Sequence, residues 1–513
     1  MDAFIKTVTD VNNAINSVVW NYGVFLLVGA GVLLTLVTKV FQISHLKHWW
    51  TNTICTVFKK DSTTTKKTDK KAITQWQSLC TALAATIGTG NIAGVAAAIC
   101  LGGPGAVFWM WVAAFLGMMT NYSENILGIF FRRRNKDGEW SGGAMYYLKD
   151  GLGSKKGFGG IAKVLAVLFA IFAILASFGI GNMGQVNKIT LNMQSAFFAE
   201  DCLGYVGNTT IPVINLIIGL SLVAIGALII LGGLQRIATF AERIVPFMAI
   251  FYVIGSLFIL FVNIDKVGDM FTSIFKFAFG GQAVAGGALG VVIQQGCKRG
   301  VFSNEAGLGS SVMVHSSSDV KEPVRQGMWG IFEVFFDTMI ACTMSAIVCL
   351  SSGYINLETG AVAEGISDAT LVSQTFGDVF GSLFGSTGAF LGRGFVAIAM
   401  LLFAFTTVLG WSQYGGKAVE YLFGVKGVKI YKVIFVLMIV SGAVMTSSLA
   451  WDISDTFNGL MMVPNLIGVV ALFPLVMKLT QNYVDRKIKG KDVAPMLSYD
   501  ALIQKEMEAK ADD

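Results

Sequence analysis

Long apolar runs separated by short polar segments are the dominant pattern along the chain. A run of about 20 apolar residues is long enough for a helix to cross the hydrocarbon core of a bilayer. The pattern therefore predicts an all-α polytopic membrane protein with eleven transmembrane helices. We expect these spans at residues 21–42, 74–101, 105–131, 162–186, 213–233, 238–264, 280–302, 326–352, 386–411, 430–449 and 454–478.

Basic residues mark the segments that we expect in the cytoplasm. Residues 43–73 contain seven lysines, and residues 132–161 contain seven basic residues. Residues 352–386 contain no Lys or Arg and are acidic, as in an outer loop. Because basic loops stay on the inner side of a membrane, this distribution predicts a plasma (inner) membrane protein with its N terminus outside and its C terminus in the cytoplasm.

Composition changes this picture little. The chain is 54% hydrophobic and 14% charged, and its formal net charge of +6 follows from the basic inner face, so it implies no nucleic acid partner. Residues 1–20 lack a basic start, a short apolar stretch and a small-residue cleavage site, so we expect the first span to stay in the mature chain. The seven cysteines and three histidines show neither a disulfide framework nor metal-ligand spacing within the spans.

The second predicted span is interrupted by small and polar residues. The stretch ATIGTGNIAGVAAAI places Gly88, Thr89, Gly90 and Asn91 together near its middle. Gly90 and Gly94 alone would suit a close contact between two helices. However, a polar Asn91 at mid-membrane needs partners, and the flanking glycines favour non-helical backbone. The whole stretch therefore predicts an unwound turn that exposes main-chain groups to a cavity, as in transporters that hold an ion and a charged solute.

The same interpretation predicts a second interruption five spans later. The seventh span begins GGQAVAGGALG, where Gly280, Gly281, Gly286, Gly287 and Gly290 would weaken a continuous helix. Spans two to six and seven to eleven would then be inverted repeats, because a unit of five helices re-enters the membrane from the opposite face. The predicted segments are an N-terminal part with the first span and a basic loop (1–73), a first five-helix repeat (74–264), a second repeat (265–480) and a cytoplasmic tail (481–513).

A tetrapeptide also recurs along the chain. NIAG begins at Asn91, and NEAG begins at Asn304. We do not interpret this repeat as a second functional motif, because Asn304 lies past the apolar part of its span. The sequence SNEAG is typical of a helix cap at the inner face.

Six stretches of the sequence are specific when they are taken together. They are IGTGNIAGVAAAI, GPGAVFWMWVAAFLGM, FGIGNMGQVN, RGVFSNEAGLGSS, FFDTMIACTM and FTTVLGWSQYG. With them the chain resembles the alanine or glycine:cation symporters, also called sodium:alanine symporters, of the amino acid-polyamine-organocation superfamily. The resemblance implies the leucine-transporter fold, with an inverted repeat of five plus five helices and one extra N-terminal helix. Gly184 and Thr406 depart from the family pattern, and Gly184 leaves the size of the substrate side chain open.

The resemblance implies a sodium site between the interrupted span and span nine. We expect the sodium ligands to be the hydroxyls of Thr406 and Thr407 and the carbonyls of Ala84 and Ile87, because a hard cation takes oxygen ligands. The alternative is that both threonines only bond back to carbonyls one turn earlier in their own helix. Sodium is thus the implied co-transported ion.

The implied solute site combines main-chain groups at the interruptions with nearby side chains. Asn182 and Gln185 would bind an ammonium or a carboxylate, or would only join helices through hydrogen bonds. Trp411 would wall off the side-chain pocket, or would lie at the membrane interface. The full expected set is Gly88, Thr89, Gly90, Asn91, Asn182, Gln185, Gly286, Gly287, Gly290 and Trp411.

Four ionisable residues fall within predicted spans, namely Glu124, Glu333, Asp337 and Arg393. A charge inside the membrane is a candidate for function, although pairing for helix packing is equally common. Asp337 lies near the middle of span eight, with Glu333 one turn before it. We expect Asp337 to support the cation region or a gate rather than to bind the solute.

Together these features favour a secondary-active symporter that couples inward sodium flux to uptake of a small neutral amino acid, alanine or glycine, by alternating access. The alternatives on the same fold are a proton-coupled carrier and an amino acid exchanger. A channel would favour rings of repeated pore-lining groups, and a membrane enzyme would need a clustered nucleophile and base. The sequence has neither pattern, so we expect no enzyme activity, and it does not decide the oligomeric state.

Overall fold

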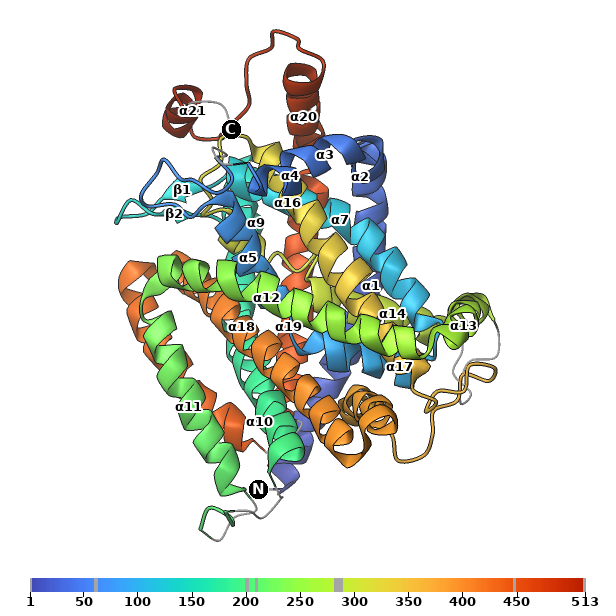
Figure 1. Cartoon of the computed structure of the whole chain (residues 1–513). Coiled ribbons are helices and arrows are strands. Elements are labelled where there is room, and N and C mark those ends of the chain that lie inside the picture. Colours follow the sequence, from blue (N-terminus) through green and yellow to red (C-terminus); the bar gives the residue numbers. More distant parts are fainter. Residues whose placement is uncertain are drawn as a thin grey trace.

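The computed structural model describes residues 2–59, 63–198, 203–207, 211–280, 289–445 and 449–510. The chain forms a bundle of long helices (Figure 1). Its first half contains α1 (Asp2–Val37), α2 (Phe41–Ser44), α3 (Leu46–Asn52), α4 (Ile54–Val57), α5 (Gln75–Thr86), the π-helical turn η1 (Gly90–Gly94), α6 (Val95–Gly102), α7 (Ala106–Phe130), α8 (Ala144–Tyr146), η2 (Tyr147–Gly151), η3 (Leu152–Ser154), α9 (Gly159–Phe178), η4 (Gly179–Met183), α10 (Gly184–Phe197), α11 (Val213–Ile230) and α12 (Gly233–Val262).

The second half continues the bundle, and its helices pack between those of the first half. It contains η5 (Ile264–Lys266), α13 (Val267–Phe279), α14 (Leu289–Asn304), α15 (Val312–His315), α16 (Pro323–Val334), η7 (Phe335–Cys342), α17 (Thr343–Ser351), α18 (Asp368–Val444), α19 (Leu449–Ala471), α20 (Phe473–Tyr483), η8 (Val484–Ile488) and α21 (Ala501–Glu508). The strands β1 (Arg133–Arg134) and β2 (Trp140–Ser141) form an antiparallel hairpin. Extensive packing joins α16 and α14 to α7, and joins α9, α10 and α11 to α18.

Several helices are long and apolar enough to cross a membrane. Within the described residues six helices have this length and composition, and eight spans result if each of two bent helix pairs counts as one. The long helix α18 contains the whole predicted span 386–411 and most of the predicted span 430–449. Its backbone leaves the helical region at Gly385 and again at Gly424. The exact number of eleven spans stays a prediction.

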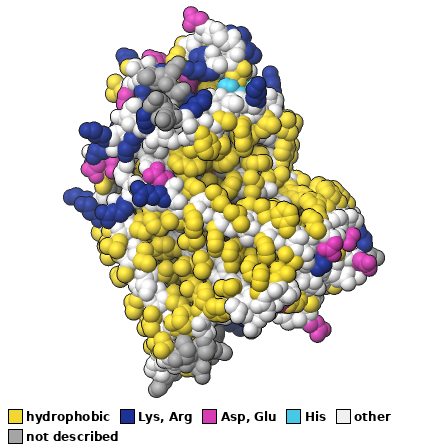
Figure 2. Space-filling model, viewed as in Figure 1, with side chains coloured by type: hydrophobic (Ala, Val, Ile, Leu, Met, Phe, Trp, Pro, Cys, Tyr) yellow, Lys and Arg dark blue, Asp and Glu magenta, His cyan; other side chains and the backbone are white. Residues whose placement is uncertain are grey.

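The surface divides into an apolar belt and a basic end. Hydrophobic side chains cover the middle of the face in Figure 2, whereas Lys and Arg gather toward its upper end and left edge. The hairpin and α21 lie at that upper end (Figure 1). Leu228 and Phe261 are each 69% exposed, which suits contact with lipid better than contact with water.

The first interruption lies where the sequence predicts it. A capping box starts α5, in which Thr74 Oγ1 accepts from the Gln77 amide at 3.0 Å and the Gln77 side chain accepts from the Thr74 amide at 3.1 Å. The helix ends at Thr86, and Ile87 is extended with ψ of 91°. The chain then turns by 55° into η1 and α6. The predicted unwound turn is therefore confirmed.

The second half has an interruption that the sequence analysis did not predict. Residues 281–288, which include Gly286 and Gly287, lie outside the described residues. Helix α14 ends at Asn304, and the backbone then has positive φ at Glu305 (57°), Gly307 (92°) and Gly309 (71°). Glycine tolerates such angles without strain. SNEAG therefore does end a helix, since Ser303 and Asn304 form the end of α14. It is not an exposed cap, however, because these residues and Glu305 are buried and lead into a non-helical link to α15.

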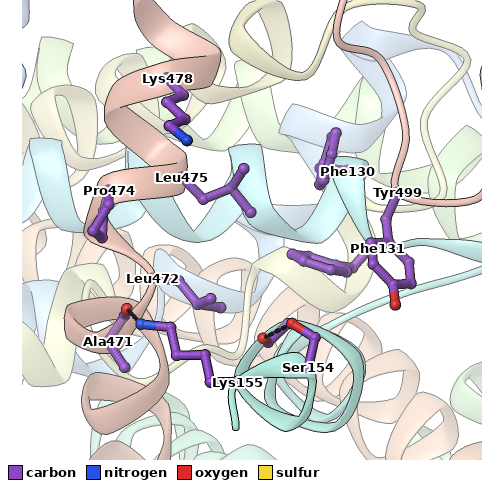
Figure 3. A pocket seen from close by; sticks show the side chains of 11 residues that line it. Phe130, Phe131, Ser154, Lys155, Ala471, Leu472, Pro474, Leu475, Lys478 and Tyr499 are labelled. Carbon is purple, nitrogen blue, oxygen red and sulfur yellow. Dashed lines mark hydrogen bonds between the residues drawn. The ribbon is translucent and has the colours of Figure 1, made fainter.

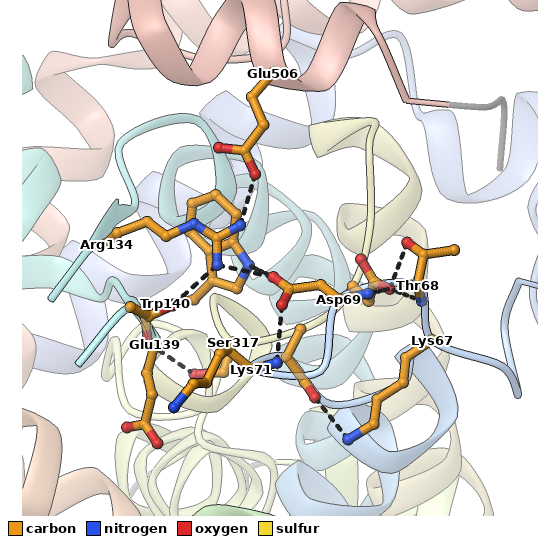
Figure 4. Close-up of polar contacts among 12 residues, drawn as sticks. Lys67, Thr68, Asp69, Lys71, Arg134, Glu139, Trp140, Ser317 and Glu506 are labelled. Atoms are coloured by element: carbon orange, nitrogen blue, oxygen red, sulfur yellow. Dashed lines mark hydrogen bonds and ion pairs between the residues drawn. The ribbon is translucent and has the colours of Figure 1, made fainter.

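Charged side chains from distant segments meet at the basic end (Figure 4). Asp69 accepts hydrogen bonds from Arg134 Nη1 at 2.8 Å and from Trp140 Nε1 at 3.0 Å. Arg134 also pairs with Glu506 of α21 at 2.6 Å. The tail is thereby tied to the loop before α5 and to the hairpin. We call this cluster the clasp, which consists of Thr68, Asp69, Arg134, Trp140, Asp319, Glu506 and Lys510.

Asp319 is the second acidic member of the clasp. It pairs with Lys510 near the end of the tail and accepts from the amides of Thr68 at 2.5 Å and Asp69 at 3.0 Å. Burial raises the pKa of Asp319, but the bond from Lys510 and those two amides outweigh this effect, so its pKa lies below the ordinary value. The clasp therefore holds an ionised carboxylate at neutral pH.

Candidate functional site

Asn91 organises the first interruption. Its Oδ1 accepts from the Gly88 amide at 2.9 Å, and its Nδ2 donates to Asp337 Oδ1 at 2.7 Å. In a continuous helix the Gly88 amide would instead bond the carbonyl of Ala84. Ser345 Oγ donates to the Asn91 carbonyl. Asn91 thus supplies both an acceptor and a donor inside the protein, and it holds the unwound turn open.

Asp337 connects the two interrupted helices. It is fully buried in η7, a π-helical segment, which is a common deviation at functional sites. Besides Asn91, its carboxylate accepts from Ser303 Oγ at 2.8 Å and from Thr338 Oγ1 at 2.9 Å. Ser303 lies at the end of α14, directly before the second interruption. The side chain therefore fixes both breaks to one point.

Gln185 reaches the first interruption, whereas Asn182 does not. Gln185 Oε1 accepts from the Thr89 amide at 3.2 Å, and Gln185 Nε2 donates to the Ile180 carbonyl at 3.0 Å. Asn182 Nδ2 instead donates to the Phe435 carbonyl in α18 at 2.7 Å. The two residues that the sequence analysis grouped therefore serve different contacts.

The adjacent threonines of α18 also point to different places. Thr407 Oγ1 lies 3.3 Å from the Ile87 carbonyl and 3.0 Å from the Phe403 carbonyl. Thr406 Oγ1 is 2.9 Å from each of two carbonyls one turn earlier and 3.4 Å from Met248 Sδ. Both threonines thus make the back-bonds that the alternative interpretation predicts, and of the two only Thr407 also reaches the interruption.

A narrow cavity lies between these groups. Its empty volume is about 260 Å³ including gaps between atoms and any part open to solvent, and this leaves room for about one water molecule. Its wall is formed by residues of α5, η1, η4, α10, α14, α18 and α19, so it lies where the two interruptions converge. The lining residues are Ala85, Thr86, Gly88, Gly90, Ile180, Gln185, Phe302, Glu305, Thr407, Trp411 and Asn458.

Glu305 is the lining residue that sequence reasoning missed. It is 4% exposed, and its carboxylate accepts from Trp411 Nε1 at 2.9 Å and from Ser310 Oγ. Both donors are uncharged, so no cation of the described chain is bonded to this carboxylate. The repeated tetrapeptide was the signal that could have found it, since Glu305 follows Asn304 in NEAG.

Two further acceptors at the cavity have no partner within the described residues. Asn458 Oδ1 and Thr86 Oγ1 are buried, and neither forms a hydrogen bond. Buried polar atoms are nearly always hydrogen-bonded in folded proteins, so unpaired ones in a cavity point to a ligand or to water. With Glu305, they make the lining of the cavity rich in acceptors.

Close packing explains the small residues around the cavity. A Cβ at Gly88 would lie 2.5 Å from Thr407 Oγ1, and a Cβ at Gly181 would lie 2.5 Å from Trp411 Cγ. Trp411 is only 2% exposed, so it forms a wall of the cavity rather than part of an interfacial belt. Gly290 is exposed in the first turn of α14, and nothing lies within 4 Å of the position a Cβ would take.

Buried helix interruptions that meet at a cavity, within a bundle of apolar helices, define the class of membrane transporters with broken helices. A match to a protein-family model supports this class. It is described as the sodium:alanine symporter family and matches residues 5–496, so the chain belongs to this family. It is accordingly a multi-pass membrane protein.

Individual relatives cover nearly the whole chain. The chain is 41% identical over 482 residues to "Sodium/alanine symporter AgcS" of Methanococcus maripaludis, which spans 94% of this chain and 98% of the relative. It is 34% identical over 480 residues to "Probable sodium/glutamine symporter GlnT" of Bacillus subtilis, with 93% and 91% covered. Among solved structures, MhsT in complex with L-phenylalanine has a TM-score of 0.51 at 14% identity, covering 80% of this chain and 99% of MhsT. That likeness concerns the fold alone.

Proposed function

We propose that the protein is a sodium-coupled symporter that brings a small neutral amino acid, alanine or glycine, into the cell by alternating access. The observation that carries this proposal is the convergence of two interrupted helices on one buried cavity. Family membership and the relative named as a sodium/alanine symporter support it. In this proposal the chain has eleven spans with an inverted repeat of five plus five, and the basic end faces the cytoplasm.

Sodium binds in this proposal beside Thr407. Its hydroxyl and the Ile87 carbonyl are 3.3 Å apart, and the Gly88 amide turns toward Asn91 and away from the Ala84 carbonyl. Hydroxyl and carbonyl oxygens are the ligands that a hard cation prefers. Thr406 has no role in this site, because its hydroxyl faces Met248.

The amino acid lies across the cavity in this proposal. Its carboxylate faces the main chain at Thr89 and Gly90, near the N-terminal end of η1, where the helix dipole is positive. There it replaces Gln185 Oε1 at the Thr89 amide, while the Gly88 amide stays bonded to Asn91. Its ammonium faces the Glu305 carboxylate and Asn458 Oδ1, since an ammonium carries only donors and these oxygens accept. Trp411 and Phe302 close the space for the side chain, which favours a hydrogen or a methyl group.

One sodium ion per transport cycle supplies enough free energy for concentrative uptake of the amino acid. One sodium ion moving through a potential of 100 mV contributes about 2.3 kcal/mol. A tenfold sodium gradient adds about 1.4 kcal/mol, so the sum could maintain a solute gradient of about 500-fold.

Uptake of labelled alanine into proteoliposomes tests this function. A sodium, potassium or proton gradient is imposed in turn, with unlabelled amino acids as competitors. The proposal expects uptake only with inward sodium, and it expects glycine to compete better than glutamine. Uptake driven by protons alone would favour a proton-coupled carrier, and uptake that depends only on internal amino acid would favour an exchanger.

A further inference from the structure

A groove away from the transport cavity opens at the basic end (Figure 3). It lies between the end of α7, the η3 turn and the junction of α19 with α20, and its empty volume is about 800 Å³ including the part open to solvent. Its wall is mainly apolar. The lining residues are Phe130, Phe131, Gly151, Ser154, Lys155, Ala471, Leu472, Pro474, Leu475, Lys478 and Tyr499.

The charge of this groove is positive. Lys155 and Lys478 line it, and no acidic residue does. Lys155 Nζ donates to the Ala471 carbonyl, an otherwise open group at the end of α19. Lys478 is exposed and has no acidic partner among the described residues. Helix α20 also begins at Phe473, so the positive end of its dipole adds to the same field.

The groove spans the boundary between the apolar belt and the basic end. The axis of the chain bends by 58° between α19 and α20, where the apolar helix gives way to the polar tail. Ile467 and Met477, on either side of this bend, are 40% and 43% exposed. If the basic end faces the cytoplasm, as in the proposed orientation, the groove lies at the level of the inner-leaflet headgroups.

We propose that this groove binds an anionic phospholipid of the inner leaflet. Its phosphate accepts hydrogen bonds from Lys478 and Lys155, and the exposed hydroxyl of Tyr499 donates at the rim. The acyl chains lie along Phe130 and Leu475 and continue into the apolar belt. Basic pockets at the cytoplasmic side of membrane helices recognise such headgroups, and the apolar wall distinguishes a lipid from free phosphate.

The test measures lipid binding to the purified full-length chain in nanodiscs of phosphatidylcholine, with phosphatidylglycerol added in steps. Melting temperature and lipid retention in native mass spectrometry are the readouts. We expect phosphatidylglycerol to raise the melting temperature, and Lys478→Gln to weaken the apparent affinity about fivefold. Lys155→Gln is the second variant. Lys156→Gln is the matched control, because this exposed neighbour does not line the groove.

Each other outcome overturns the proposal. If phosphatidylglycerol raised the melting temperature equally in wild type and Lys478→Gln, the lipid would act through unspecific surface charge. The same would follow if Lys156→Gln lost as much lipid affinity as Lys478→Gln. A full response to inorganic phosphate, without lipid, would indicate a small-anion site. Because these readouts do not involve sodium or alanine, a failure of the transport proposal leaves the result interpretable, and a failure here leaves the transport proposal untouched.

Discussion

The cavity and the clasp both contain buried polar groups, but they satisfy them in different ways. In the clasp, Asp69 and Asp319 accept from cations and from amides, so each charge has a partner within the chain. In the cavity, Glu305 meets only uncharged donors, and Asn458 Oδ1 meets none. A polar cluster that is complete serves the fold, whereas one that lacks partners needs a ligand. The difference distinguishes a binding site from a structural tie.

Removing the charge of the cavity should have the largest effect. We expect Glu305→Gln to lower the affinity for alanine at least about 30-fold, because a buried ammonium loses its charged partner. Competition with labelled alanine uptake measures this change. Glu506→Gln in the clasp is the matched control and should leave the affinity unchanged. An equal affinity in Glu305→Gln would remove this residue from the site.

The next effect concerns the link between the two interruptions. Asp337→Asn replaces one acceptor with a donor, so either Asn91 Nδ2 or Ser303 Oγ loses its bond. We expect turnover to fall about tenfold, as one unsatisfied buried group costs about 1–3 kcal/mol. Initial uptake rates at saturating sodium and alanine test this. Unchanged turnover and sodium dependence would exclude a supporting role for Asp337.

The two adjacent threonines of α18 test whether the ion site depends on Thr407 in particular. Thr407→Ala should raise the sodium concentration for half-maximal uptake about tenfold, the cost of about 1.4 kcal/mol of lost ion binding. Thr406→Ala is the neighbouring control and should change that concentration less than about twofold, a few tenths of a kcal/mol. Equal shifts in the two variants would contradict the assignment of the ion to Thr407.

The clasp should affect stability but not substrate affinity. We expect Asp319→Asn to lower the melting temperature by about 2–4 °C at pH 7, because it removes the ion pair with Lys510. The pKa of Asp319 is lowered in the folded protein, so its contribution is present above the unfolded value of about 3.9 and is lost as the pH falls through the folded value. Melting curves from pH 7 to pH 3 should therefore converge for the two proteins.

The sequence predicted the features that depend on short-range patterns. Apolar runs gave the helical membrane class, and Gly88 with Asn91 gave the first interruption, because a polar residue between glycines is costly in a continuous buried helix. The role of Trp411 could not be predicted from the sequence. Its position near the end of a predicted span is equally compatible with lining the cavity and with lying at the membrane interface.

The sequence could not predict features that depend on packing between distant segments. The NEAG repeat, which contains Glu305, was given little weight because Asn304 lies past the apolar part of its predicted span. The structure buries both residues through contacts with other helices. Similarly, the i to i+3 spacing of Asn182 and Gln185 suggested a common face, but the π-helical turn η4 directs them to different partners.

Sodium-dependent binding of labelled alanine to the purified protein tests the central claim most directly. The measurement compares wild type, Glu305→Gln, Thr407→Ala and the clasp variant Glu506→Gln over a range of sodium concentrations. The account predicts that wild type and Glu506→Gln bind alanine only with sodium, that Thr407→Ala requires about tenfold more sodium, and that Glu305→Gln binds poorly at every sodium concentration. Alanine binding that is independent of sodium and equal in all four proteins would contradict it.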